Sequence, residues 1–437
     1  MTVLDQIAAR IAGGCPITPA DRRAAVEAII DTLACIVAGR DDDATRAVIA
    51  AKPATGGPCD SVAGATDAAT AALINGVAGH ALDFDDNFGP GMSHASAVMV
   101  PALIAVGQQT GVTGRQLVDA YLAGLEAQAL VGQGVRPQHY TAGWHGTSTI
   151  APIGTAAGAA MLIGADGVQA MSLAVSTACG PKGQFGTSAK PFHAGAAARN
   201  ATEAALLARA GLRGRADILE GPQGFGELFG AGVPAIWDIV PDAPHVIGVE
   251  GLSPKLHPCC GSTHNAIDML HDLRRDPGFA ADDVAHITIA VALANYRNLA
   301  YPDPQTEMEA RFSMQYCLAR ALHQDVLSLA DFTPAAIFAP HIRADMAKVE
   351  MTLLPENEQA AALKAAHRMT VRLKDGRVAE AARSHARGTI RDPLTPDQRR
   401  AKFADCTGRP DLHDRLQDLD ALPDLRLLGE VLRLQPA

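Results

Sequence analysis

The stretch TPADRRAAVEAIIDTLACIVAG, residues 18–39, decides the fold class. It opens with Thr18, Pro19 and Asp21, which suit an N-cap, the first helical position and the positive end of a helix dipole. Apolar residues then recur at positions i, i+3, i+4 and i+7, and Gly39 is suited to end the segment. The spacing predicts a long helix whose apolar side is buried.

Similar segments fill the first two thirds of the chain. They are apolar and rich in small residues, and helices that are apolar on all sides are usually buried in a helical core. Aromatic residues make up only 4% of the chain, so small aliphatic side chains and close helix packing must fill the interior. Further helices are predicted at 69–82, 98–109, 114–130, 149–162 and 199–210.

The pattern changes after about residue 265. Residues 286–291, 348–353 and 367–373 have the alternation and composition of strands. Asp375 and Gly376 then form a hairpin signal, and residues 377–381 are its candidate return strand.

The chain has 437 residues, which favours two domains over one. We therefore predict a mainly α protein. A large all-helical domain comprises residues 1–267 with 393–437, and a smaller α+β domain comprises residues 268–392.

Composition excludes several classes of protein. The net charge is −10, whereas a nucleic-acid binder would carry a basic surface. Eight cysteines are too few for a disulfide scaffold, and the start of the chain lacks the basic and apolar regions of a signal peptide. The charge-free stretch 139–165 contains His145, Pro152 and many glycines, so it is a poor membrane span. We expect a cytoplasmic protein with no nucleic-acid or membrane partner.

Four polar clusters interrupt the apolar chain. The first, residues 80–94, contains three acids including Asp83 at the end of an apolar helix, then a Gly/Pro loop and His94. This places acid and base groups on a loop held by a rigid element, as catalysis requires. The alternative is an acidic helix end without function, which the helix dipole disfavours.

The second and third clusters lie at predicted helix starts. His145, in WHGTST (144–149), precedes a buried helix, where backbone N–H groups favour an anion. The hydroxyls around it could instead only cap that helix. Lys190, in AKPFHAG (189–195), is a candidate point charge for a carboxylate, and a solvated lysine is the alternative. Its surroundings lack the spacing of a phosphate-binding P-loop.

The fourth cluster is KLHPCCGSTH, residues 255–264. Cysteine and histidine at this density suggest zinc, but the spacing is wrong for a C-x-x-C pair. We favour Lys255 and His257 lining a site, with the adjacent cysteines as packing residues. None of the motifs requires a cofactor.

Taken together, these clusters resemble the MmgE/PrpD family. The matching stretches run in the family's order: HALDFDDN (80–87) with SHAS (93–96), WHGTST (144–149), AKPFHAG (189–195) with ARN (198–200), KLHPCCGSTH (255–264) and RFSMQYC (311–317). The family includes 2-methylcitrate dehydratases, cis-aconitate decarboxylases and an iminodisuccinate epimerase. The resemblance implies a large helical domain with a smaller α+β lid domain, a site in the cleft between them, a homodimer, and no metal or organic cofactor.

The resemblance also implies a set of site residues. Positions matching the family's active site are Asp83, His94, His145, Lys190 and Lys255, and further substrate-binding candidates are Asn87, Arg199 and His257. These groups suit the removal of a proton, or of CO2, from the carbon beside a carboxylate. The lysines would neutralise the developing charge, an imidazole would move the proton, and the aspartate would orient or assist it.

Three departures from the family pattern guide the choice of reaction. Asn87 stands where members often have threonine, one arginine is missing within residues 195–200, and Gly261 replaces a frequent arginine. Fewer cations favour an epimerase or racemase that removes and returns an α-proton on a small dicarboxylate such as iminodisuccinate. The alternatives are a hydro-lyase of the 2-methylcitrate dehydratase type, a decarboxylase of the cis-aconitate type, and a non-catalytic dicarboxylate-binding protein.

Overall fold

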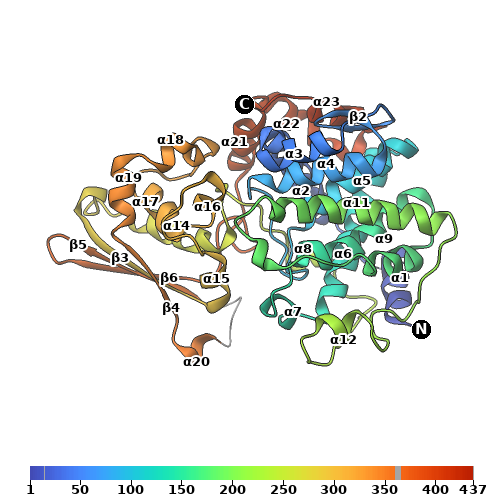
Figure 1. Cartoon of the computed structure of the whole chain (residues 1–437), viewed down its shortest axis with the longest axis horizontal. Coiled ribbons are helices and arrows are strands. Elements are labelled where there is room, and N and C mark those ends of the chain that lie inside the picture. The colour runs from blue at the N-terminus through green and yellow to red at the C-terminus, as the bar shows by residue number, and fades with distance from the viewer. Residues whose placement is uncertain (14, 360–365, 437) are drawn as a thin grey trace. The chain divides into compact units, whose positions relative to one another are not determined.

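The computed structural model describes residues 1–13, 15–359 and 366–436. The chain forms two compact units (Figure 1). It is mainly α-helical, as predicted. The first unit comprises Met1–Gln184, Ser188–Pro254 and Arg399–Ala437, and the second comprises Phe185–Thr187 and Lys255–Gln398.

Long helices packed on one another build the first unit. Helix α4 packs on α11 and α5, and α9 packs on α6 and α11. The helices are α1 (Val3–Gly13), α2 (Pro19–Ala38), α3 (Asp43–Ala51), α4 (Ala68–Ala81), α5 (Ala95–Thr110), α6 (Gly114–Gln133), α7 (Gln138–Thr141), α8 (Gly146–Thr149), α9 (Ala151–Ile163), α10 (Gly167–Val175), α11 (Ala189–Arg209), α12 (Phe225–Phe229), α13 (Val246–Val249), α22 (Pro410–Leu416) and α23 (Arg426–Leu432). Helix α21 (Pro396–Thr407) belongs to this unit from Arg399 onward.

The predicted start of α2 is confirmed. The Thr18 side chain accepts a hydrogen bond from the Asp21 backbone N–H, and the Asp21 carboxylate accepts one from the Thr18 backbone. This reciprocal capping box satisfies two amide groups that the helix itself leaves without partners.

Small residues let α4 and α11 approach closely. A Cβ atom added at Gly76 of α4 would lie 2.8 Å from the Cα atom of Gly195 in α11. Nine buried alanines of α4, α5 and α11 share one core cluster with Cys59 and Val98. The close approach confirms that small residues rather than aromatic ones fill this core, and it sets the position of the first turn of α11.

One hairpin in the first unit is absent from the prediction. Strands β1 (Cys59–Ser61) and β2 (Gly64–Thr66) pair antiparallel. The buried Asn75 of α4 accepts a hydrogen bond from the Val62 N–H and donates one to the Asp60 carbonyl. The hairpin therefore depends on a contact with a helix that follows it in the chain, which strand periodicity does not reveal.

The apolar stretch at 139–165 contains a long helical segment. Within the described residues, Gly146–Ile163 alone is long and apolar enough to cross a membrane by composition. It is 89% buried inside the protein, as is typical of a core helix.

The second unit is built on a four-stranded sheet. The strands are β3 (Val284–Val291), β4 (Val349–Leu353), β5 (His367–Leu373) and β6 (Val378–Arg383), in the order β4-β3-β5-β6. Strand β4 is parallel to β3, and the other neighbours are antiparallel. The helices are α14 (Gly261–Leu273), α15 (Leu293–Asn298), α16 (Glu307–Arg311), α17 (Met314–Ala321), α18 (Pro334–Ile337), α19 (Pro340–Met346) and α20 (Glu356–Gln359). The predicted hairpin is present, with Gly376 at φ +91° in its turn.

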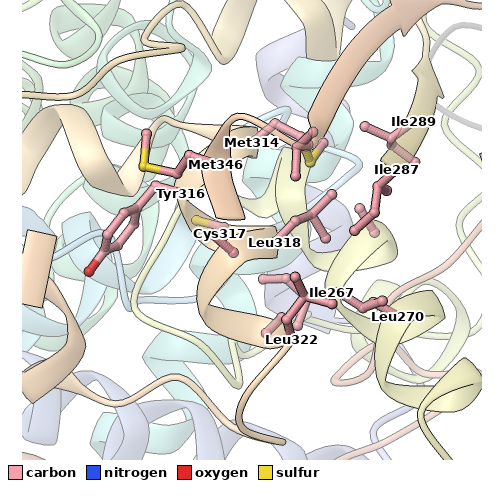
Figure 2. Packing of buried hydrophobic residues seen from close by; sticks show 14 of the residues in the cluster. Ile267, Leu270, Ile287, Ile289, Met314, Tyr316, Cys317, Leu318, Leu322 and Met346 are labelled. Carbon is pink, nitrogen blue, oxygen red and sulfur yellow. The ribbon is translucent and has the colours of Figure 1, made fainter. Parts of the chain in front are cut away.

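The sheet of the second unit buries one face against helices. Figure 2 shows Ile287 and Ile289 of β3 facing side chains of α14 and α17 such as Ile267 and Leu318. This unit thus has a core of its own, as a separate domain requires. The predicted domain boundary at residues 267 and 268 falls inside α14.

Candidate functional site

The first cluster forms a buried turn between α4 and α5. Asp83 follows the end of α4 with φ +50°, in the left-handed region that non-glycine residues rarely adopt. Its side chain and those of Asp85 and Asp86 are all buried, at 2% exposure or less. Backbone strain of this kind persists only where surrounding contacts hold it, and it is often found at functional sites.

A chain of charged and polar groups runs through this turn. The His80 ring, in the last turn of α4, donates from Nδ1 to the Asp85 carboxylate over 2.8 Å. Its Nε2 atom lies 3.0 Å from the Lys190 ammonium and therefore accepts from it. Lys190 also forms a buried ion pair with Asp83. These contacts stabilise the buried ammonium, because a charge in a protein interior must be paired.

His94 is held at the start of α5. Its Nδ1 atom donates to the Asp86 backbone carbonyl over 2.9 Å and lies 3.4 Å from the Asp85 carboxylate. Its backbone N–H donates to the Thr147 hydroxyl over 2.9 Å. Because a carbonyl can only accept, the neutral ring carries its lone pair on Nε2. Nε2 is therefore the atom of His94 that is able to accept a proton.

Asp86 fixes the helix that carries His94. Its carboxyl group accepts from the backbone N–H and the hydroxyl of Ser96, and this hydroxyl lies 2.6 Å from the Tyr121 hydroxyl. Burial raises the pKa of Asp86 to about 7, although the Ser96 hydrogen bonds oppose this shift. The bonds anchor the first turn of α5 and thereby the backbone of His94.

His145 and His193 form the other side of the cluster. Their Nδ1 atoms are 3.2 Å apart, so one ring must donate and the other accept. Burial lowers the pKa of His145 well below its usual value, and the charge of Lys190 lowers it further. Burial likewise lowers the pKa of His193 to about 4. Both rings are therefore neutral at physiological pH.

Three imidazoles meet at the ends of three helices. The ring centroids of His80 and His94 are 4.4 Å apart, and that of His145 lies 5.9 Å from His80 and 6.1 Å from His94. Lys190 reaches the same place from the first turn of α11. The positive ends of α5 and α11 point to this cluster and favour an anionic ligand. The structure therefore brings together Asp83, His94, His145 and Lys190, four of the predicted site residues.

The same rings come close enough to hold a metal ion, but their contacts suit proton transfer better. The Lys190 ammonium already occupies the Nε2 side of His80 and would repel a cation. A second group in the described part of the chain, Cys15 with Glu126 and His245, also has ligand spacing. There the His245 Nε2 donates to the Leu122 carbonyl, its Nδ1 accepts from the Ile247 N–H, and Arg10 neutralises Glu126.

The structure gives contacts for two further predicted substrate-binding residues, and a substrate-binding role for Asn87 stays a prediction. The Arg199 guanidinium donates to the Asn200 side chain. Arg199 lies nine residues after Lys190 in α11, roughly 13 Å along the helix, so this placement does not support a role beside the cluster. The Asn87 backbone pairs with Ser253, with N···O distances of 2.9 and 2.8 Å. Asn87 thus fastens the end of the acidic turn.

The remaining candidates belong to the second unit. Lys255 is its first residue after Pro254 and is 1% exposed. His257 accepts the Leu327 N–H on Nδ1 over 3.1 Å, and burial together with His264 lowers its pKa well below the usual value. His257 therefore helps to hold the second unit together. The substrate-binding roles of Lys255 and His257 stay predictions.

Sequence reasoning missed three members of the cluster. His80 and Asp85 lie in the motif that attracted attention to Asp83, and His193 lies three residues after Lys190, on the same side of α11. One sequence feature could have predicted the His80–Asp85 pair: a histidine ends an apolar helix, and a carboxylate follows it five residues later.

The low pKa values of the buried histidines make stability depend on pH. Burial lowers the pKa of His139 and of His193 to about 4, below the value near 6.5 of an unfolded chain. As the pH falls, the unfolded chain therefore binds protons before the folded protein does. The stability that the neutral, buried histidines contribute is complete above about pH 6.5 and is lost as the pH falls towards 4. We expect the free energy of unfolding to fall by about 1.4 kcal/mol per pH unit for each histidine.

Urea unfolding between pH 7 and pH 4.5 measures this loss. A His193→Gln variant should show a shallower dependence than the wild type because one titrating ring is gone. Parallel curves for the two proteins would contradict the assignment of a low pKa to His193.

Known proteins and family models match most of the chain. A model of the MmgE/PrpD N-terminal domain matches residues 14–236, and a model of the MmgE/PrpD C-terminal domain matches residues 257–420. Human cis-aconitate decarboxylase is 28% identical over 346 residues, covering 76% of this chain and 71% of the human protein. The mouse cis-aconitate decarboxylase is 28% identical over 76% of this chain and 70% of its own. The cis-aconitate decarboxylase-like protein oryM of Aspergillus oryzae is 26% identical, covering 80% of this chain and 78% of its own.

Proposed function

Because the chain belongs to the MmgE/PrpD family of enzymes, we propose that it is a lyase that removes CO2 from a small unsaturated tricarboxylate of the cis-aconitate kind. The relatives support a decarboxylase, the alternative of the sequence prediction, better than the epimerase that we favoured first. The observation that carries the proposal is the buried cluster of one paired lysine and three imidazoles.

The reaction needs a place for negative charge and a source of one proton. When the C–CO2 bond breaks, its electron pair forms a new double bond. The pair of the old double bond moves to the carbon beside a second carboxylate. That carbon then takes one proton, so CO2 leaves and an unsaturated dicarboxylate remains. A fixed cation beside the developing charge supplies the largest stabilisation, and Lys190 is such a cation, since Asp83 and His80 hold it in place.

His94 is the proposed proton carrier. Its Nδ1–H is held by the Asp86 carbonyl, and the Asp85 carboxylate lies 3.4 Å away, which stabilises a charged ring. His145 is the weaker candidate because burial, and then the charge of Lys190, lowers its pKa and disfavours a positive charge on the ring. We propose that His145 stays neutral and hydrogen-bonds to the substrate. The role of Lys255 as a second cation remains a prediction.

The test is product analysis with cis-aconitate and related unsaturated tricarboxylates in D2O. We expect release of CO2 and one deuterium per molecule on the carbon that receives the proton, seen by proton NMR. A folded protein that releases no CO2 from any of these acids would overturn the proposal.

The epimerase stays a second candidate because Asn87 and Gly261 depart from the family pattern. Its signature in the same NMR experiment is exchange of an α-hydrogen of a saturated dicarboxylate, with no CO2 and no alkene formed. A non-catalytic binding protein would bind such acids, and a His94→Ala variant would bind them equally well.

The homodimer and the cytoplasmic location also stay predictions, and sedimentation of the purified protein would check the dimer.

A further inference from the structure

Lys402 connects the C-terminal part of the first unit to the acidic turn. It lies in α21 and is 4% exposed. Its ammonium donates to the Phe84 backbone carbonyl over 2.7 Å and to the Asp31 carboxylate of α2 over 2.9 Å. It also lies 4.1 Å from the centre of the Phe84 ring. A residue 318 positions away in the chain thus holds the backbone between Asp83 and Asp85.

The turn needs such a contact. Asp83 has φ +50°, and a non-glycine residue keeps such a sparsely populated conformation only where its surroundings hold it. The Phe84 carbonyl belongs to the peptide that joins Phe84 to Asp85. Fixing this peptide sets the directions of both flanking carboxylates, one of which pairs with Lys190 and the other with His80.

The surroundings of Lys402 keep its ammonium charged. Burial lowers the pKa of Lys402, but the attraction of Asp31 outweighs this, and the pKa lies above its usual value. Burial raises the pKa values of the neighbouring thiols of Cys35 and Cys406, so both are neutral. One cation, one anion and one carbonyl therefore meet beside an aromatic ring, an arrangement more specific than a surface ion pair.

We propose that Lys402 is a positioning residue of the active site, which acts through the Phe84 carbonyl to hold Asp83 and Asp85 where they orient Lys190 and His80. The kinetic consequence rests on the proposed function, whereas the effect on the turn does not. The competing view is that the Lys402–Asp31 pair only fastens the C-terminal segment to α2.

A matched control separates these views. Arg22 of α2 also fastens the C-terminal segment, through an ion pair with Asp420, and additionally pairs with Asp119. An Arg22→Met variant loses this attachment without touching the acidic turn. We expect it to lose stability and keep kcat within about twofold of the wild type.

The central variant is Lys402→Met. Small misplacements of catalytic groups cost about 10²-fold, so we expect kcat to fall between tenfold and a hundredfold. Lys402→Arg keeps a cation beside Phe84 and should recover part of the rate. Lys402→Met leaves Asp31 buried without its cation and can therefore destabilise the fold. The double variant Asp31→Leu/Lys402→Met avoids this problem, because apolar replacement of both members of a buried pair is often neutral for stability. We expect it to fold like the wild type and to keep the low kcat.

Two further readouts distinguish positioning from a general loss of stability. In an Asp83→Asn/Asp85→Asn background, Lys402→Met should lower kcat by less than threefold, because both carboxylates through which it acts are already lost. Amide hydrogen exchange in peptides covering residues 83–94 should become faster in the Asp31→Leu/Lys402→Met variant and stay unchanged in Arg22→Met.

The results of these experiments decide whether Lys402 positions the acidic turn. Additive effects of Lys402→Met and the Asp83→Asn/Asp85→Asn change, or unchanged exchange at residues 83–94 in the Asp31→Leu/Lys402→Met variant, would overturn the positioning role. If the wild type turns over none of the acids tested, the proposed function fails, and the hydrogen-exchange measurement still decides whether Lys402 holds the turn.

Discussion

Replacing Lys190 by methionine should lower kcat/KM by about 10²–10³-fold, the effect of removing one preorganised electrostatic contact. Methionine keeps most of the volume of the side chain and removes its charge. The Lys190 side chain is buried, and its ammonium contacts both Asp83 and His80. Loss of the cation therefore removes the group that would neutralise the carbanion. Steady-state kinetics with cis-aconitate measures the effect.

The same change should destabilise the protein, because Asp83 would be left buried without its ion pair. Breaking a buried pair by removing one partner costs about 3–5 kcal/mol. A Lys190→Met/Asp83→Asn variant should regain stability in urea unfolding but not activity. Arg10→Met, which breaks the equally buried pair with Glu126, is the control and should lose stability while keeping kcat. A Lys190→Met protein with wild-type kcat/KM would contradict the electrostatic role.

Replacing His94 by asparagine should lower kcat by about 10²–10⁴-fold, the usual contribution of a positioned proton donor or base. The asparagine amide can still donate to the Asp86 carbonyl, as His94 Nδ1 does, so the start of α5 should keep its geometry. The variant lacks a nitrogen that can carry a proton to carbon. We expect KM to change little, because the change removes proton transfer and leaves Lys190 in place. Rapid-quench measurement of CO2 release and of deuterium in the product would follow both steps.

A histidine elsewhere provides the control for this experiment. His245 is the N-cap of α13, and asparagine is a good N-cap residue. His245→Asn should therefore keep its kcat and most of its stability. If His94→Asn retained kcat within threefold of the wild type, another group would have to carry the proton, and His145 would be the first to test.

The features that the sequence predicted best depend on neighbours within a few residues. The capping box at Thr18 and the hairpin at Gly376 are confirmed because each is made by groups close together in the chain. The resemblance to a family of enzymes also rests on local motifs, and the domain models confirm it. The β1–β2 hairpin was missed because Asn75, a residue of a later helix, holds it.

Local motifs did not separate binding residues from structural ones. Arg199 and Lys190 lie on one helix, and the sequence analysis named both as substrate-binding candidates. The structure pairs Lys190 with Asp83, whereas the Arg199 guanidinium donates to its neighbour Asn200. Periodicity gives the direction of a side chain around its own helix, but it does not show which other element that side chain meets.

The sequence by itself therefore determined the helical class, the hairpin of the sheet and the family. It also determined the set of acid, imidazole and lysine groups. All of these follow from propensity, capping and motifs, which act over a few residues. Only the tertiary structure decided which of these groups act together. The Lys190–Asp83 and Lys402–Phe84 contacts join positions 107 and 318 residues apart. Likewise, the proton positions on His80 and His94 and the low pKa of His145 follow from burial and from partners that folding brings together.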